Sequence, residues 1–160
     1  MKNKNLHLSW PHLALGAIGL ALSAYAWHEH LVIKAGNESG CYVSETINCE
    51  SVLSSKYAEL VGIPLGVFGM VYFAVVLMTA ISTEADFSPR RFALTQLAVS
   101  LVGIATATVL IYISKVIIGA FCPICMATHA TTSLLFLFSL RACFRARKLE
   151  KGMAAAQNAL

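Results

Sequence analysis

The sequence predicts an all-α integral membrane protein, a bundle of four transmembrane helices with a short surface half-helix in its first outer loop. The chain has 160 residues, of which 58% are hydrophobic and only 12% are charged, about half the charged share of a soluble domain. No Asp, Glu, Lys or Arg occurs in residues 8–27, 60–83, 92–114 or 116–140. Each of these ranges is long enough to cross a bilayer as a helix, and their continuous rather than alternating hydrophobicity excludes a closed barrel.

The apolar ranges set the expected elements. We expect one membrane domain over residues 1–160, with spans at about residues 11–33, 63–82, 92–114 and 119–141. In the outer loop, residues 34–62, Asn48 is a good N-cap for a helix that starts at Cys49. This helix is too short to span and suits a membrane surface. In the second span, Gly66 and Gly69 permit another helix to approach closely.

The basic residues orient the bundle. Nine of the twelve Lys and Arg residues fall on one side of the predicted membrane, namely Lys2, Lys4, Arg90, Arg91, Arg141, Arg145, Arg147, Lys148 and Lys151. Both termini are therefore expected in the cytoplasm, and the net charge of +4 reflects topology rather than nucleic-acid binding. The N-terminus also resembles a signal peptide with a cleavage site at Ala24-Tyr25-Ala26, but cleavage would leave the later segments on the same sides.

Four of the five cysteines fall on the outer side. Cys41 and Cys49 lie in the outer loop, Cys122 opens the fourth span from the same side, and Cys125 lies one turn deeper. Disulfides persist outside the cytosol, so thiol–disulfide chemistry is sustainable there. Cys143 falls at the cytoplasmic end of the fourth span, where we expect a reduced, small apolar filler.

Phe121-Cys122-Pro123-Ile124-Cys125 is the sharpest motif. Residues three apart share a helix face, proline suits a first helical turn, and a helix N-terminus stabilises a thiolate, the species that attacks disulfides. Alone, this pair would also fit a structural disulfide or half a metal site, and the loop pair a static disulfide. Together the two pairs permit a relay from external thiols to a lipid-soluble quinone.

Two further side chains are candidates for quinone contact. His129 lies four residues after Cys125 on the same helical face, and ionisable residues inside a span are functional candidates. It is suited to donate a hydrogen bond or proton to a quinone carbonyl; the alternative is a neutral imidazole bonded to a neighbouring helix. Ser55 is suited to bond a quinone, to cap or to bond back to its helix. His28 and His30 point apart on one helix, so we expect a solvated polar rim there rather than a metal site.

These residues closely resemble the vitamin K epoxide reductase family in its bacterial form, over about residues 10–142. The resemblance is carried by Cys41, Cys49, Ser54-Ser55, Tyr57, Gly62-Ile63-Pro64, Gly69 and Cys122-Pro123-Ile124-Cys125. It implies a four-helix bundle around a quinone, covered by the half-helix. It further implies that Cys41 and Cys49 are the shuttle pair, that Cys49 forms a transient disulfide with Cys122, and that Cys125 faces the quinone. Ser55 matches the family's hydroxyl position.

Two departures from the family pattern bear on the reaction. His129 stands where the vertebrate enzymes carry Tyr, and Ile63-Pro64-Leu65-Gly66 lacks their Asn, which disfavours epoxide chemistry as the main activity. Many bacterial members carry a fused thioredoxin-like domain. This chain ends about twenty residues after its last span, so the resemblance implies a separate thioredoxin-fold, DsbA-like partner.

The sequence thus predicts a quinone-dependent thiol oxidoreductase of the bacterial inner (plasma) membrane, with its active cysteines on the periplasmic side. It would reoxidise its partner and drive disulfide formation in exported proteins. The acceptor would be ubiquinone, menaquinone or vitamin K, with no metal and no flavin. One alternative is a vitamin K epoxide or quinone reductase that uses the same cysteines. Another is a soft-metal binding membrane protein with thiolate ligands, which requires the four outer cysteines to stay reduced.

Overall fold

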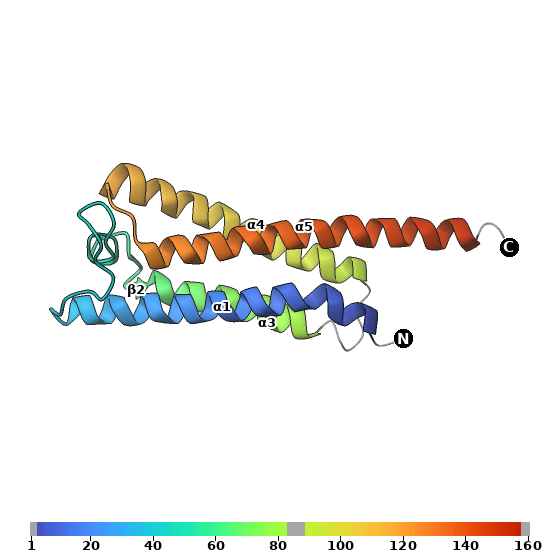
Figure 1. Cartoon of the computed structure of the whole chain (residues 1–160), viewed down its shortest axis with the longest axis horizontal. Helices are drawn as coiled ribbons and strands as arrows, with labels where there is room; N and C mark the ends of the chain where they lie inside the picture. The colour runs from blue at the N-terminus through green and yellow to red at the C-terminus, as the bar shows by residue number, and fades with distance from the viewer. Residues whose placement is uncertain (1–2, 83–88, 158–160) are drawn as a thin grey trace.

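The structure is a computed structural model that describes residues 3–82 and 89–157, and over these it is dominated by four long helices (Figure 1). The elements in chain order are α1 (Asn3–Lys34), α2 (Glu50–Leu53), β1 (Glu59–Leu60), β2 (Ile63–Pro64), α3 (Leu65–Ser82), α4 (Pro89–Tyr112), the π-helix η1 (Ile113–Ile118) and α5 (Pro123–Gln157). The all-α prediction is therefore confirmed. Lys2, one of the residues used to orient the chain, lies outside the described residues.

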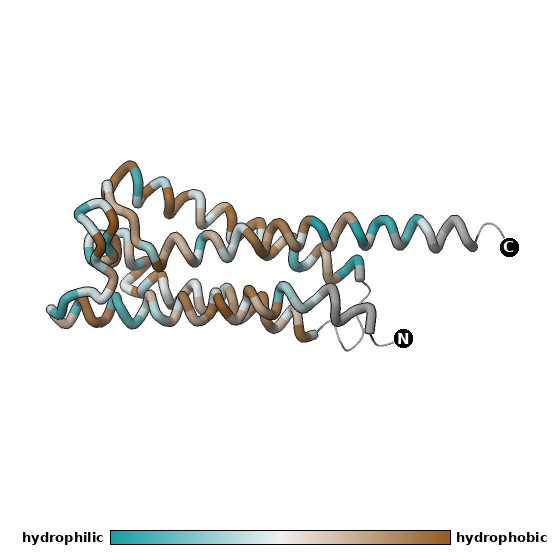
Figure 2. Tube along the Cα trace, in the orientation of Figure 1, coloured by the Kyte–Doolittle hydropathy of each residue, from teal (hydrophilic) through white to brown (hydrophobic). Residues whose placement is uncertain are grey.

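Within the described residues, three helical segments are long and apolar enough to cross a membrane: α3, α4 continued by η1, and α5. Apolar colours dominate the middle of these helices, whereas polar colours gather in the outer loop and in the C-terminal half of α5 ahead of its grey end (Figure 2). The first helix is not among the three, because it carries several polar residues on its buried face. These are Ser9, His12, Ser23, Glu29 and His30. A membrane span at residues 11–33, the first of the four expected, therefore remains a prediction.

The helix pairs α1–α3 and α4–α5 have the most extensive contacts, and α5 also packs on α1. The α1–α3 interface depends on glycines in both helices. A Cβ at Gly19 would lie 2.1 Å from a ring carbon of Phe73, and one at Gly69 would lie 2.6 Å from the Ser23 hydroxyl oxygen. The close approach expected at Gly69 is confirmed, and the neighbour is α1.

The arrangement of the helices separates the two ends of the bundle. The start of α1 and the end of α5 point toward one end, and the outer loop lies at the other, beside the start of α5 (Figure 1). Cys143 lies well along α5, free and buried against Ala93, Ala142 and Ala146. The prediction that Cys143 is a small apolar filler is confirmed.

In the outer loop, α2 is a single turn. The Ser51 N–H donates to the Asn48 Oδ1 at 2.8 Å, so Asn48 does cap this turn as its side chain predicted. The Leu53 N–H donates to the Cys49 carbonyl at 2.8 Å, and the helix proper begins at Glu50 rather than at Cys49. Its position at a membrane surface remains a prediction.

A tight hairpin connects this loop to α3. β1 and β2 pair antiparallel with Leu60 opposite Ile63, and the two residues between them, Val61 and Gly62, have φ angles of 55° and 77°. Two positive φ angles are the mark of a type I′ turn. The second span was expected from residue 63, but α3 starts only at Leu65. Residue type alone does not predict this turn, because a β-branched residue such as Val61 rarely adopts a positive φ.

The end of the third long helix also differs from the expectation. The spans expected at residues 92–114 and 119–141 leave residues 115–118 as a tight connection, but Lys115 lies inside η1, and the connection is formed by residues 119–122. The Gly119 N–H donates to the Ser114 carbonyl at 2.9 Å, which is a five-residue helical step. Gly119 then ends the helix with φ of 77°. Such π-turns occur frequently at functional sites, and η1 forms part of a cavity wall.

Candidate active site

The outer loop closes a disulfide between Cys41 and Cys49, whose Cα atoms are 5.7 Å apart. Cys49 is fully buried, whereas Cys41 is half-buried. Backbone contacts hold the segment just before Cys49. Ile47 pairs in parallel with Phe121, and the Phe121 N–H donates to the Thr46 carbonyl at 2.8 Å. The loop is thereby attached to the segment that leads into α5.

This attachment brings the two cysteine pairs together. The Cys122 Sγ lies 3.4 Å from the Cys49 Sγ, and both residues are almost completely buried. Cys122 and Cys125 are free, and the Cys125 N–H donates to the Cys122 Sγ at 3.2 Å. A backbone N–H aimed at sulfur at the start of a helix favours the thiolate. Pro123 opens α5, as its place in the motif predicted.

A cavity of about 340 Å³ lies beside the sulfurs of Cys122 and Cys125. Its walls come from α1, α3, α4, η1 and α5, and residues of the outer loop close one end. The lining is predominantly apolar and includes Leu53, Phe68, Phe73, Val102, Leu110 and Ile118. A cavity of this size and character suits a small, largely apolar ligand.

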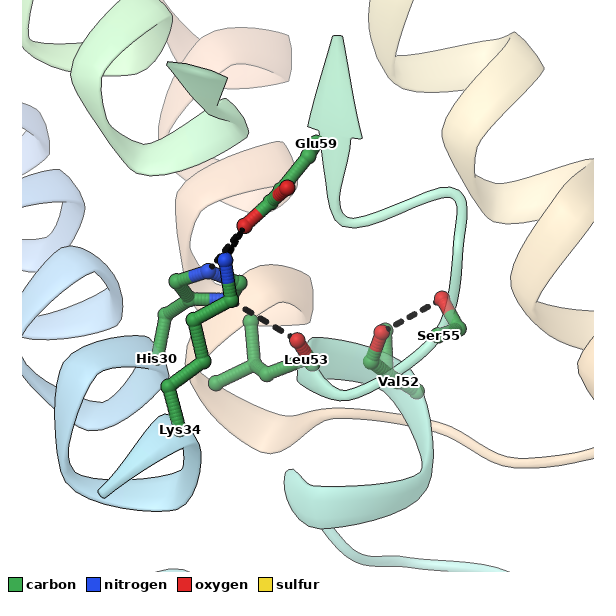
Figure 3. A network of polar contacts seen from close by, with 6 residues as sticks. All are labelled: His30, Lys34, Val52, Leu53, Ser55 and Glu59. Atoms are coloured by element: carbon green, nitrogen blue, oxygen red, sulfur yellow. Dashed lines mark hydrogen bonds and ion pairs between the residues drawn. The ribbon is translucent and has the colours of Figure 1, made fainter. Parts of the chain in front are cut away.

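The two predicted quinone contacts differ in their surroundings. His129 is half-buried and lines the cavity with Cys125. Ser55 is not part of the described cavity wall; its hydroxyl donates to the Val52 carbonyl at 2.7 Å (Figure 3), the back-bonding alternative. A quinone contact by Ser55 therefore remains a prediction that requires this hydroxyl to turn. Tyr57, two residues later, does line the cavity.

A polar clamp, formed by His30, Lys34 and Glu59, ties the outer loop to α1 (Figure 3). His30 is buried, and its Nδ1 lies 2.8 Å from the Leu53 carbonyl oxygen while its Nε2 lies 2.9 Å from the Glu59 Oε1. Both ring nitrogens of His30 therefore lie within hydrogen-bond distance of an oxygen atom in the outer loop. Lys34 also bonds to the Glu59 Oε1. The clamp holds the end of α2 and the start of the hairpin over the cavity.

The prediction of a solvated rim at residues 28–30 was wrong for two of its three residues. His28 is exposed, but Glu29 and His30 are each 4% exposed. The outer loop folds back over this part of α1, and their polar atoms are satisfied by loop residues. One signal was available: His30 lies four residues after Ala26 and seven after Ser23, so it continues the buried face of α1.

The clamp predicts a pH dependence in acid. Hydrogen bonds from Lys34, and then from His30, lower the pKa of Glu59 below its ordinary value of 4.5. A carboxyl with a lowered folded-state pKa stabilises the fold above its unfolded pKa, and this contribution disappears as pH falls through the folded pKa. We expect the protection of the backbone amides at residues 54–64, measured relative to their intrinsic exchange rates at each pH, to fall in wild type as the pH drops below about 4.5.

The substitution Glu59→Gln should remove that pH dependence and leave the loop exchanging faster throughout. Glu45→Gln, at an exposed loop position, is the matched control and should behave as wild type. An unchanged acid transition in the Glu59→Gln protein would show that the clamp does not cause it.

Comparison with known families places these features in context. The chain matches the vitamin K epoxide reductase family over residues 10–140, a range that contains both cysteine pairs, the clamp and the whole cavity wall. The resemblance drawn from the motifs is thereby confirmed. With its apolar helices and its joined cysteine pairs, the chain belongs to the vitamin K epoxide reductase family and is a multi-pass membrane oxidoreductase.

Proposed function

We propose that this protein is a quinone-dependent thiol oxidoreductase that reoxidises a thioredoxin-fold partner and so drives disulfide formation in exported proteins. The proposal depends on one observation, the 3.4 Å approach of the Cys49 and Cys122 sulfurs. This contact joins the disulfide of the outer loop to a dithiol at the wall of an apolar cavity. Electrons have a continuous route from water to the interior of the bundle.

The first half of the cycle takes place at the loop. A thiolate of the reduced partner attacks the Cys41 Sγ, the more exposed sulfur of its pair, and Cys49 leaves as a thiolate. The second partner thiol then displaces Cys41, which completes the partner's disulfide and leaves the loop pair reduced. Each step is an ordinary thiol–disulfide exchange.

The second half passes the electron pair inward. Cys49 attacks Cys122 in a Cys122–Cys125 disulfide, and Cys125 leaves as a thiolate. Cys41 then attacks Cys49 and releases Cys122, which restores the loop disulfide. Cys122 and Cys125 now hold two electrons, and transfer of these with two protons to a quinone restores their disulfide. The arrangement in the structure, a loop disulfide beside free Cys122 and Cys125, fits the stage just before quinone reduction.

The cavity fits the proposed acceptor. A quinone ring is flat and largely apolar, with two carbonyl oxygens, and it supplies the capacity to take up two electrons. The cavity volume of about 340 Å³ lies within the usual range for small-molecule sites. Its apolar walls exclude water, and Cys125 and His129 offer reactive and polar groups one helical turn apart. We propose ubiquinone or menaquinone as the acceptor.

We place the protein in the bacterial plasma membrane with both termini in the cytoplasm and both cysteine pairs on the periplasmic side. The distribution of Lys and Arg supports this orientation. So does the shape of the bundle, in which the start of α1 and the end of α5 lie opposite the outer loop (Figure 1). A separate thioredoxin-fold protein is the proposed electron donor.

The test is anaerobic mixing of the purified protein, ubiquinone-1 and a reduced thioredoxin-fold protein, with the quinone absorbance followed over time. We expect one quinone consumed for each donor disulfide formed. No quinone consumption above the rate without protein would overturn the proposal. Menaquinone in place of ubiquinone-1 identifies the preferred acceptor.

The family's description favours one second candidate, a vitamin K epoxide reductase that uses the same cysteines. Parallel assays with the epoxide and with the quinone separate the two, since faster turnover of the epoxide would favour this candidate. The soft-metal alternative requires four reduced outer cysteines, so the Cys41–Cys49 disulfide counts against it. In residues 3–82 and 89–157 no group of three or more His, Cys, Asp or Glu side chains is placed to hold an ion.

We propose that His129 donates a hydrogen bond or proton to a quinone carbonyl. His129→Phe keeps a flat ring but removes both nitrogens, and one hydrogen bond contributes about 0.5–1.5 kcal/mol. We expect kcat/KM for ubiquinone-1 to fall by up to about ten-fold. Ser133→Ala, an exposed position one turn further along α5, is the control. Unchanged kinetics in His129→Phe would leave this imidazole a packing role.

A further inference from the structure

Glu29 is a buried carboxylate beside the loop disulfide, and the cycle described above gives it no role. It is only 4% exposed. Its Oε2 accepts hydrogen bonds from the Ser39 hydroxyl and from the Gly40 N–H, each at 3.1 Å. The Ser39 Oγ in turn lies 3.4 Å from the Cys41 Sγ. A single hydroxyl therefore separates a buried carboxylate from the outer sulfur of the relay.

Two of the contacts of Ser39 have a defined direction. The Cys41 N–H donates to the Ser39 Oγ at 3.3 Å, and the hydroxyl has one proton, which it donates to Glu29. The oxygen of Ser39 thus faces Cys41 with a lone pair rather than with its proton. When Cys41 is reduced, its S–H meets an acceptor whose own proton already points at a carboxylate, as in a two-step proton relay.

We propose that Glu29 accepts, through the Ser39 hydroxyl, the proton that the Cys41 thiol loses when it attacks Cys49. This inference rests on the proposed function and adds the proton path at its outer end. Glu29 acts through another group and is a positioning residue, whereas Ser39 touches the reacting sulfur. The reverse transfer protonates Cys41 when a partner thiol displaces it.

The step is balanced in atoms and electrons. The Cys41–Cys49 bond forms, the Cys49–Cys122 bond breaks, and Cys122 leaves with the electron pair. The Cys41 proton moves to the Ser39 oxygen while the Ser39 proton moves to the Glu29 Oε2. In the described part of the chain, the other titratable groups facing Glu29 are the Tyr25 hydroxyl on α1 and Cys122 at the start of α5.

A single-turnover experiment isolates this step. The fully reduced protein holds two electron pairs and should reduce two equivalents of ubiquinone-1 under anaerobic conditions. The first equivalent is reduced by Cys122 and Cys125 directly, in a fast phase. The second must wait until Cys41 and Cys49 have refilled that pair, so the slow phase reports the attack by Cys41.

We expect Glu29→Gln and Ser39→Ala to slow only the slow phase, by about ten-fold or more at pH 7, because a general base typically contributes 10² to 10⁴. The difference in slow-phase rate between these variants and wild type should shrink as the pH rises past the ordinary thiol pKa of about 8.5, because Cys41 then ionises without a base. The Cys49–Cys122 mixed disulfide should accumulate during the delay, as seen by acid quenching and peptide mapping.

The controls separate proton transfer from loop packing. Glu29→Gln leaves a side-chain oxygen that can still accept the hydrogen bonds of Ser39 and Gly40. Ser39→Thr keeps the hydroxyl group. Glu38→Gln removes an exposed charge next to Ser39. Ser39→Thr should recover most of the slow-phase rate that Ser39→Ala loses, and Glu38→Gln should match wild type. A Glu29→Gln protein with an unchanged slow phase, or one slowed equally at pH 7 and at pH 9, would overturn the proposal.

The relay can also be measured without a quinone, so that its failure is distinct from failure of the proposed function. With Cys122 and Cys125 both replaced by alanine, the reduced loop pair is oxidised by glutathione disulfide, beginning at Cys41. The rate of this oxidation should depend less steeply on pH in the protein that keeps Glu29 than in the one that also carries Glu29→Gln. Identical profiles would overturn the relay whatever the quinone assay shows.

Discussion

Replacing Cys125 with alanine is expected to stop quinone reduction while the fold stays intact. Cys125 lies on the cavity wall one turn inside Cys122, and without its sulfur the membrane pair cannot form the disulfide that holds its oxidised state. We expect the rate with a reduced thioredoxin-fold donor to fall by about 10³-fold or more, the scale seen when a nucleophile is removed. The measurement is anaerobic quinone absorbance.

Cys143→Ala is the matched control for that substitution. Cys143 is also a free cysteine in α5, but it packs against alanines away from the cavity, so the variant should keep wild-type turnover. Circular dichroism and thermal unfolding in detergent should show both proteins folded. Quinone reduction by Cys125→Ala at more than a few per cent of the wild-type rate would contradict the proposed route.

A second large effect is expected from removing together the first and the last of the four cysteines in the proposed electron route. The double substitution Cys41→Ala and Cys125→Ala leaves Cys49 and Cys122 as facing thiols, with sulfurs 3.4 Å apart in the structure. Mild oxidation with copper–phenanthroline should convert them almost completely into one disulfide, because no other thiol at the site is left to resolve it. Mass spectrometry of the alkylated, digested protein measures the yield.

The comparison variant carries Cys41→Ala and Cys122→Ala, which leaves Cys49 and Cys125. The structure brings the Cys49 Sγ to the Cys122 Sγ, whereas Cys125 lies one helical turn further along α5, so we expect far less cross-linking under the same oxidation. Equal yields from the two proteins would mean that the loop moves freely over the start of α5. That result would remove the specific Cys49–Cys122 contact from the mechanism.

Much of the architecture could be predicted because membrane helices are encoded locally. The long uncharged ranges predicted the positions of α3, α4 and α5. The Cys-x-x-Cys motif correctly placed Pro123 in the first turn of a helix, although the last span was expected from residue 119 and α5 begins only at Pro123. Asn48 likewise predicted the capped turn of α2. In each case a few neighbouring residues determine the structure, whatever packs against them.

The features that escaped prediction depend on residues far apart in the chain. Glu29 and His30 look like a solvated rim until the outer loop folds back over α1, and Glu59 joins His30 only through that fold. The π-helical turn before Gly119 and the left-handed Val61 likewise run against local preference. Tertiary contacts decide such positions, and the local pattern alone does not reveal them.

The attachment of the outer loop at Phe121 has a consequence for speed. Opening the Cys41–Cys49 disulfide removes one covalent restraint on the loop, but the Phe121–Thr46 main-chain bond does not depend on the oxidation state of any sulfur. Cys49 therefore need not search for Cys122 anew in each cycle. Their encounter stays intramolecular, with the high effective molarity that such tethering gives. In the proposed cycle, delivery of electrons by the thioredoxin-fold donor is then the step most sensitive to concentration.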